Sequence, residues 1–129
     1  MLVVDASVLA PFLVDRGSDG PRIRARLRGE HLAGPALVKI ETQSVLRRRS
    51  LAGLLDADAA DAAVAELARL PILTYPAEPL LRRAWELRRN VTTYDACYVA
   101  LAEGLDAVLL TGDARLANAS GPRCTIELV

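Results

Sequence analysis

Two short runs of aliphatic residues, one near each end of the chain, carry the clearest hydrophobic pattern. Met1–Val4 and Ala107–Leu110 are almost wholly apolar, and each passes into a segment with helical periodicity. Aliphatic runs of this length are typical of strands buried on both faces in a parallel sheet. We therefore predict two short, buried parallel strands, with further strands at His31–Ala33, Ile72–Tyr75 and, at one edge, Cys124–Leu128.

Between these strands, apolar residues recur every three or four positions, as on one face of a helix. Glycine and proline mark several helix ends. The predicted helices are Ala6–Val14, Arg22–Arg28, the segment that Gly34-Pro35 opens and that runs to about Arg49, Ala57–Leu70, Glu78–Arg89, Tyr94–Glu103 and Asp113–Asn118. Strands that alternate with helices in this way specify a three-layer α/β/α sandwich with a mostly parallel central sheet.

The size and composition of the chain suit one domain over residues 1–129. Of the 129 residues, 52% are hydrophobic, which is enough for a core of its own. No run approaches the roughly 18 apolar residues of a membrane span, and the first residues lack the basic start of a secretory signal. We therefore expect a cytoplasmic protein with no membrane partner.

Cysteines and large apolar residues on the helices are expected inside. Cys97 and Cys124 lie far apart and lack metal-binding spacing, so they indicate buried free thiols rather than a zinc site or a disulfide. Leu81 and Trp85, one helical turn apart, are expected in the core, although such a face can also serve an interface.

Two acidic residues follow the central strands. Asp5 comes directly after the first run, and Asp113 follows Ala107–Leu110 by way of Thr111-Gly112. In an open α/β sheet, ligands bind at the edge where the carboxyl ends of the strands lie. Both carboxylates are therefore predicted at the ligand-binding edge.

Two further acids lie on predicted helices beside apolar neighbours. Glu41 interrupts a stripe with i, i+3, i+4 spacing, and an acid on such an inward face is either paired or functional. Asp95 follows the plausible N-cap residues Thr92-Thr93 and shares one helix side with Tyr98. The stripe around Glu41 consists of Leu37, Ile40, Ser44, Val45 and Arg48.

Electrostatics argues against four bare carboxylates at close range. At about 6 Å and an effective dielectric near 20, each pair costs about 3 kcal/mol, and all six pairs cost roughly 17 kcal/mol. A domain is stable by only about 5 to 15 kcal/mol. If they converge, the acids must stay apart, share protons or bind cations. Because Lys39 is the only lysine, a divalent metal is the simpler counter-ion.

The net charge is zero, with 16 basic and 16 acidic residues, but the arginines cluster. A planar guanidinium suits phosphate, and several clusters beside a metal site favour a nucleic-acid substrate. Taken singly, each cluster is better explained as a solvated helix face. The clusters lie at Arg22 to Arg28, Arg47 to Arg49, Arg82-Arg83 and Arg88-Arg89.

Each acid taken alone also has a purely structural explanation. Asp5 and Asp113 could cap the helices that follow their strands, and Glu41 could pair with an arginine such as Arg48. These roles do not require all four acids, so the joint pattern favours a functional cluster. His31 has no second histidine and indicates neither a zinc ligand set nor a catalytic triad, so we leave it out of the site.

Four short motifs, in order along essentially the whole chain, closely resemble those of PIN-domain ribonucleases. Each is weak alone, but four in this order make a specific signal. In length and motif order, the chain is similar to VapC-type toxins of toxin-antitoxin pairs. The motifs are Val3-Val4-Asp5-Ala6-Ser7, Glu41-Thr42 with its downstream arginines, Thr93-Tyr94-Asp95-Ala96 followed by Tyr98 to Ala102, and Leu110-Thr111-Gly112-Asp113-Ala114-Arg115-Leu116.

The resemblance implies a PIN-like fold, an activity and partners. The activity is metal-dependent hydrolysis of RNA phosphodiester bonds by an endoribonuclease, with the metal activating a water. The partners are RNA, single-stranded or looped, a small cognate antitoxin and a second copy of the chain in a homodimer. The implied Mg²⁺ or Mn²⁺ site, with its two hydroxyl neighbours in last place, consists of Asp5, Glu41, Asp95, Asp113, Ser7 and Thr111.

Two other interpretations stay open at this point. A phosphoacceptor receiver domain also places acids at strand ends around Mg²⁺, but it needs a lysine near the last strand, and Lys39 is wrongly placed. A PIN scaffold without activity would bind RNA or a protein partner, although retention of all four acids argues against it. A nuclease assay with Mn²⁺ distinguishes an active enzyme from such a scaffold.

Overall fold

A five-stranded sheet forms the centre of the computed structural model, which describes residues 1–129. All neighbouring strands run parallel, in the order β3-β2-β1-β4-β5, so their carboxyl ends lie at one edge. The prediction of a mostly parallel sheet is confirmed. The strands are β1 Leu2–Val4, β2 Leu32–Pro35, β3 Ile72–Tyr75, β4 Val108–Thr111 and β5 Ile126–Leu128.

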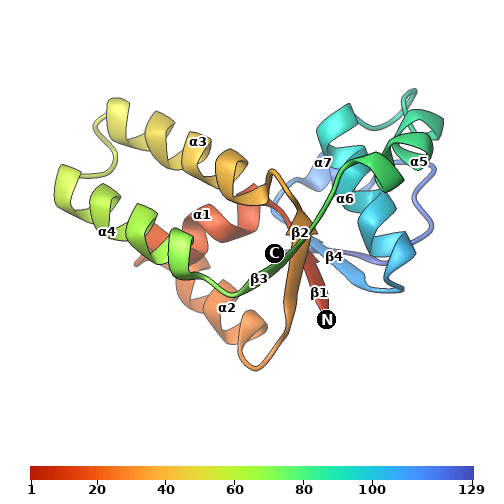
Figure 1. Ribbon diagram of the computed structural model, residues 1–129. Coiled ribbons are helices and arrows are strands. Elements are labelled where there is room, and N and C mark those ends of the chain that lie inside the picture. Colours follow the sequence, from red (N-terminus) through yellow and green to blue (C-terminus); the bar gives the residue numbers. More distant parts are fainter.

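Helices cover both faces of this sheet, which confirms the three-layer α/β/α arrangement. Figure 1 shows α1 to α4 on one side of the sheet and α5 and α6 on the other. None of the helices is both long and apolar enough to cross a bilayer. The helices are α1 Ala6–Val14, α2 Asp19–Leu27, α3 Val38–Leu51, α4 Ala57–Arg69, the 3₁₀ turn η1 Glu78–Leu80, α5 Leu81–Glu86, α6 Thr93–Gly104 and α7 Ala114–Ala117.

The two aliphatic runs form buried parallel strands, as predicted, and they lie side by side in the middle of the sheet. β1 is buried along its whole length, and its register pairs Val3 with Leu109 and Val4 with Leu110. Continued by one residue, this register sets Asp5 level with Thr111. The pairing of β1 with β4 therefore brings residues from opposite ends of the chain to one edge.

A small second core fixes α3 beside the sheet. Ala10 of α1, Leu46 of α3, and Ala63 and Leu67 of α4 form a buried cluster separate from the main core. Lys39 of α3 also donates hydrogen bonds of 3.1 and 3.0 Å to the carbonyl oxygens of Ala68 and Leu70, near the end of α4. The position of α3 is therefore set by α1 and α4 together.

Most element boundaries differ from the prediction by one or a few residues, and three of the differences have a clear basis in the structure. The edge strand starts at Ile126 rather than Cys124, because the ladder with β4 begins only where Leu109 pairs with Ile126. The helix predicted over Glu78–Arg89 is a 3₁₀ turn followed by the short α5, which ends at Glu86. The second helix begins at Asp19, with Pro21 in its first turn, where a missing N–H costs nothing.

The expectation that Leu81 and Trp85 lie in the core is wrong. They are 51% and 69% exposed, whereas Leu80, Ala84 and Leu87 form the buried side of this segment. These two stripes are one residue apart in sequence, and only the stripe of Leu80, Ala84 and Leu87 packs into the core. The two cysteines are free, as expected, but they are only partly buried rather than buried.

Candidate functional site

Asp5 is held at the carboxyl end of β1 by hydrogen bonds to both carboxylate oxygens. Oδ1 accepts from the backbone N–H groups of Ser7 and Val8, at 2.9 and 3.3 Å, and from the Ser7 hydroxyl. Oδ2 accepts from Oγ1 of Thr111 at 2.6 Å. Burial raises the pKa of Asp5, and these hydrogen bonds oppose the rise. Asp5 is thus the N-cap residue of α1, and it also lines a pocket.

Two hydroxyls extend this network to the end of β4. Ser7 Oγ accepts a hydrogen bond of 2.7 Å from the Gly112 backbone, and Thr111 Oγ1 accepts one of 3.0 Å from the Asp113 backbone. A Cβ on residue 112 would lie 3.2 Å from Ser7 Oγ, so glycine lets the two segments approach. The carboxyl ends of β1 and β4 are therefore connected by side chains as well as by the ladder.

Asp113 has the capping role that the simpler interpretation assigned to it. Its Oδ1 accepts from the Arg115 backbone N–H at 2.8 Å at the start of α7. The Arg115 side chain lies 3.6 Å away and is 94% exposed, so this ion pair is weak. The Asp113 carboxylate also lines the pocket that contains Asp5.

Glu41 projects from α3 toward α6. Its Oε1 accepts a hydrogen bond of 3.1 Å from the hydroxyl of Tyr98, which is almost fully buried. Burial raises the pKa of Glu41, the Tyr98 hydrogen bond opposes the rise, and the charges of Asp95 and Asp5 add to it. The alternative in which Glu41 pairs with Arg48 is wrong, because Glu41 forms no ion pair.

Asp95 lies in the first turn of α6, where Thr92 caps the helix. Thr92 Oγ1 accepts a hydrogen bond of 3.4 Å from the Asp95 backbone N–H. The carboxylate is partly exposed and, like those of Asp5 and Glu41, has no ion-pair partner. Three of the four acids therefore form no ion pair.

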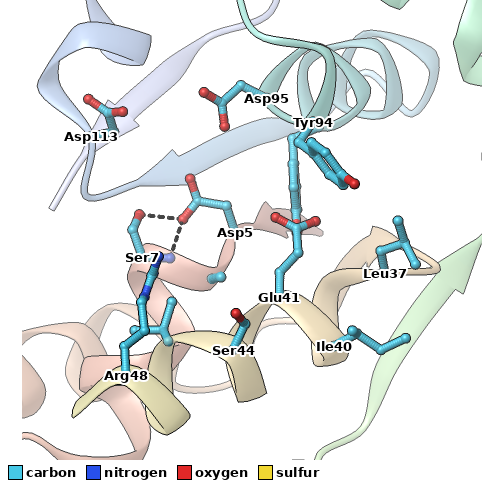
Figure 2. A pocket seen from close by; sticks show the side chains of 13 residues that line it. Asp5, Ser7, Leu37, Ile40, Glu41, Ser44, Arg48, Tyr94, Asp95 and Asp113 are labelled. Carbon is cyan, nitrogen blue, oxygen red and sulfur yellow. Dashed lines mark hydrogen bonds between the residues drawn. The ribbon is translucent and has the colours of Figure 1, made fainter. Parts of the chain in front are cut away.

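All four acids line one pocket of about 530 Å³ between α3 and α6, at the carboxyl edge of the sheet (Figure 2). No three His, Cys, Asp or Glu side chains form a ready-made metal-binding group as they lie in the structure. The fold thus gathers the four predicted acids around one space without closing them into a coordination sphere. The exposed His31 is not among the residues that line it.

Two features of this pocket were not predicted from the sequence. The first is the hydrogen bond between Tyr98 and Glu41. The helical spacing predicts that Tyr98 lies on the same helix side as Asp95, but it does not predict the contact with Glu41. The stripe that contains Leu37 and Ile40 was expected to face inward, yet these residues are 41% and 66% exposed in the pocket lining. The buried residues of α3 are Val38, Thr42 and Leu46.

Comparison with known proteins identifies the family. The sequence profile of the PIN domain matches residues 2–122, nearly the whole chain. The chain belongs to the PIN-domain family. This PIN domain is 42% identical over 128 residues to Ribonuclease VapC1 of Mycobacterium tuberculosis, with 98% of this chain and 96% of the relative covered. The receiver-domain interpretation is therefore wrong.

Solved structures share this PIN fold. One is VapC20 of Mycobacterium tuberculosis, described as a Sarcin-Ricin loop cleaving toxin, with a TM-score of 0.69, 19% identity, and 91% of this chain and 93% of that chain covered. Another is VapBC2 from Rickettsia felis, bound to a DNA fragment from its promoter, with a TM-score of 0.66, 12% identity, and 99% and 98% covered. At these identities the likeness concerns the fold.

Proposed function

We propose that this PIN domain, residues 1–129, is a metal-dependent endoribonuclease that acts as the toxin of a toxin-antitoxin pair. One observation carries the proposal: Asp5, Glu41 and Asp95 line one open pocket and have no cationic partner. The 42% identity to Ribonuclease VapC1 supports the choice of RNA as substrate. The compartment expected of such an enzyme is the cytoplasm, where its RNA lies.

The donor set of the pocket fits Mg²⁺ or Mn²⁺. Carboxylate oxygens are hard ligands, and a pocket in which Asp5, Glu41 and Asp95 form no ion pair gains from a divalent ion. We propose Asp5, Glu41 and Asp95 as ligands, with Asp113 acting through water or at a second ion. The chemistry that such an ion supplies when bound is activation of a water and stabilisation of the leaving oxygen.

The side chains around the acids have supporting roles in this proposal. Ser7 and Thr111 hold the Asp5 carboxylate in one orientation, and Tyr98 does the same for Glu41. Arg48 lines the pocket, is exposed and forms no ion pair, so its guanidinium is available to a phosphate of the RNA. Single-stranded or looped RNA fits best, because its backbone and bases are accessible.

We also propose a small antitoxin, encoded beside this chain, that covers the pocket, and a homodimer of the chain itself. The antitoxin is supported by the fold likeness to the toxin in the VapBC2 complex. Co-expression with the adjacent small reading frame should restore growth and yield a complex on purification. Light scattering of the purified complex and of the free chain tests the homodimer.

A cleavage assay on labelled single-stranded RNA tests the enzymatic proposal. Wild type should cut RNA in Mg²⁺ or Mn²⁺ and lose the activity in EDTA. Asp5→Asn and Asp95→Asn should lose several orders of magnitude while circular dichroism shows them folded. Asp58→Asn, at an exposed position of α4 outside the pocket, is the matched control and should cut like wild type. RNA binding without cutting by pure wild type in Mn²⁺ would favour the inactive scaffold.

A further inference from the structure

The pocket has an apolar part that the proposed chemistry leaves unused. Tyr94 of α6, Leu37 directly before α3 and Ile40 of α3 line it, and they are 58%, 41% and 66% exposed. In Figure 2 these three side chains lie on one side of Glu41, and the other acids lie on the opposite side. A pocket of about 530 Å³ also exceeds the needs of one hydrated ion, since a water occupies about 30 Å³.

The apolar part begins where the acids end. Tyr94 directly precedes Asp95, and Ile40 directly precedes Glu41, so each apolar side chain adjoins a carboxylate in sequence. Their exposure is unlike that of Tyr98, which is buried and hydrogen-bonded. Large apolar side chains left exposed together beside a polar pocket indicate a binding surface.

We propose that this part of the pocket binds an unpaired base of the RNA substrate, next to the cleaved phosphate. The ring of Tyr94 is the stacking platform, and Ile40 and Leu37 form the wall from α3. The inference rests on the proposed ribonuclease function and adds a substrate subsite to it. Stacking on an aromatic ring accepts any base, so the subsite selects unpaired over paired nucleotides rather than one sequence.

The charges around the pocket favour a nucleotide as the occupant. Arg48 lines the same pocket and follows Ile40 by eight residues on α3, which is about 12 Å along the helix axis. That distance exceeds the 3.4 Å step between stacked nucleotides. An RNA strand with one base stacked on Tyr94 can therefore place a phosphate of a later nucleotide at Arg48. The acids lie between Tyr94 and Arg48 (Figure 2). An apolar surface, an acidic centre and a free guanidinium match the base and the backbone of one strand.

Tyr94→Leu tests the subsite directly, with Tyr94→Phe as the variant that keeps the ring. KM and kcat are measured in Mn²⁺ on single-stranded oligonucleotides, with and without one abasic position beside the cut. Tyr94→Leu should raise KM about 5- to 100-fold, the range of stacking on one aromatic side chain. Tyr94→Phe should match wild type, and so should Trp85→Leu, an exposed aromatic residue outside the pocket.

The abasic substrate shows whether Tyr94 and the base act on each other. At one position beside the cut, removal of the base should raise the KM of wild type as much as the Tyr94→Leu substitution does. The same removal should raise the KM of Tyr94→Leu hardly any further. Additive losses at every position, or an unchanged KM for a folded Tyr94→Leu, overturn the inference.

Binding of the same oligonucleotides in EDTA, followed by fluorescence anisotropy, separates this inference from the proposed function. If wild type never cuts RNA, the ribonuclease proposal fails, yet weaker binding by Tyr94→Leu and not by Tyr94→Phe still supports the base subsite. If Tyr94→Leu binds and cuts RNA normally but releases the co-expressed antitoxin, the surface docks a protein and the inference is wrong.

Discussion

The hydroxyl of Tyr98 donates a hydrogen bond of 3.1 Å to Oε1 of Glu41, and this contact joins α6 to α3 across 57 residues of sequence. The two helices lie on opposite sides of the sheet in Figure 1. Tyr98 is 1% exposed, so its ring is fixed by the core. The bond therefore sets the position of an otherwise movable glutamate from a rigid point on the other layer.

Tyr98→Phe removes only this hydroxyl. Because hydrogen bonds to charged groups contribute about 1.5 to 3 kcal/mol when buried, and Glu41 is half-buried, we expect a loss of about 1 kcal/mol in the free energy of unfolding at pH 7. Urea denaturation measures it. Tyr75→Phe, outside the pocket, is the control and should change little. The difference between Tyr98→Phe and wild type should shrink at acid pH, once Glu41 is protonated.

Glu41→Gln should change how stability depends on pH. The folded pKa of Glu41 is raised, mainly by burial, above its unfolded value of about 4.3, so the folded state holds extra protons. The contribution of this group is fully present below the unfolded pKa and is lost as pH rises through the folded pKa. In EDTA, Glu41→Gln should therefore gain stability relative to wild type between pH 4 and 7. The exposed control Glu66→Gln should show the same change of melting temperature with pH as wild type. The same result for Glu41→Gln would contradict the prediction.

A bound metal should reverse the stability advantage that Glu41→Gln has over wild type in EDTA. At a free concentration about 100 times its Kd, an ion that binds only the folded state adds about 2.7 kcal/mol. Wild type should therefore melt at a higher temperature in Mn²⁺ than in EDTA, and Glu41→Gln should gain less. Thermal melting with and without Mn²⁺ checks both proteins without any RNA. If the melting temperature of wild type is the same with and without Mn²⁺, the proposal that the pocket binds a metal is wrong.

Thr111→Val should destabilise the protein through Asp5. It leaves the buried Oδ2 of Asp5 without its 2.6 Å donor and the Asp113 backbone N–H without its acceptor. A buried group that loses its partner costs about 1 to 3 kcal/mol. Denaturation at pH 7 measures the loss, and Thr125→Val, at an exposed position, should show almost none. A loss as small as that of the control would mean that water replaces the hydroxyl.

The sequence predicted the placement of the acids better than their contacts. The aliphatic runs determined β1 and β4, and parallel strands end at one edge whatever their side chains, so Asp5 and Asp113 could be placed together. The estimate of repulsion allowed the acids to share protons, which corresponds to a raised pKa among them. For Asp5 and Glu41, burial rather than repulsion is the main cause of the raised pKa. The estimate of repulsion did not include this cost of desolvation.

Contacts between helices were beyond the sequence pattern. Leu80 and Leu81 each begin a stripe of apolar residues at helical spacing, and periodicity alone could not show that only the stripe of Leu80 is buried. In α3 the same ambiguity assigned Ile40 to the core, although Val38 and Leu46 are the buried residues. The bond between Tyr98 and Glu41 depends on how α3 and α6 approach, which the tertiary packing decides.

Arg48 and Arg47 provide a matched test of the phosphate contact. The two exposed arginines are neighbours on α3, but only Arg48 lines the pocket. Arg48→Gln should weaken RNA binding at low salt and reduce the slope of log K against log salt by about 0.7, the value for one phosphate of a single strand. Arg47→Gln removes the same charge from the same helix and should leave the slope nearly unchanged.

The salt slope distinguishes a direct contact from a general effect of charge. If both variants lower affinity and slope alike, RNA responds to the positive charge of α3 as a whole, and the pocket does not guide the strand. If Arg48→Gln weakens binding with an unchanged slope, the arginine contacts a base or supports the fold rather than a phosphate. Only a reduced slope confined to Arg48→Gln places a phosphate of the bound strand at the end of the pocket, because release of one counterion requires one neutralised phosphate.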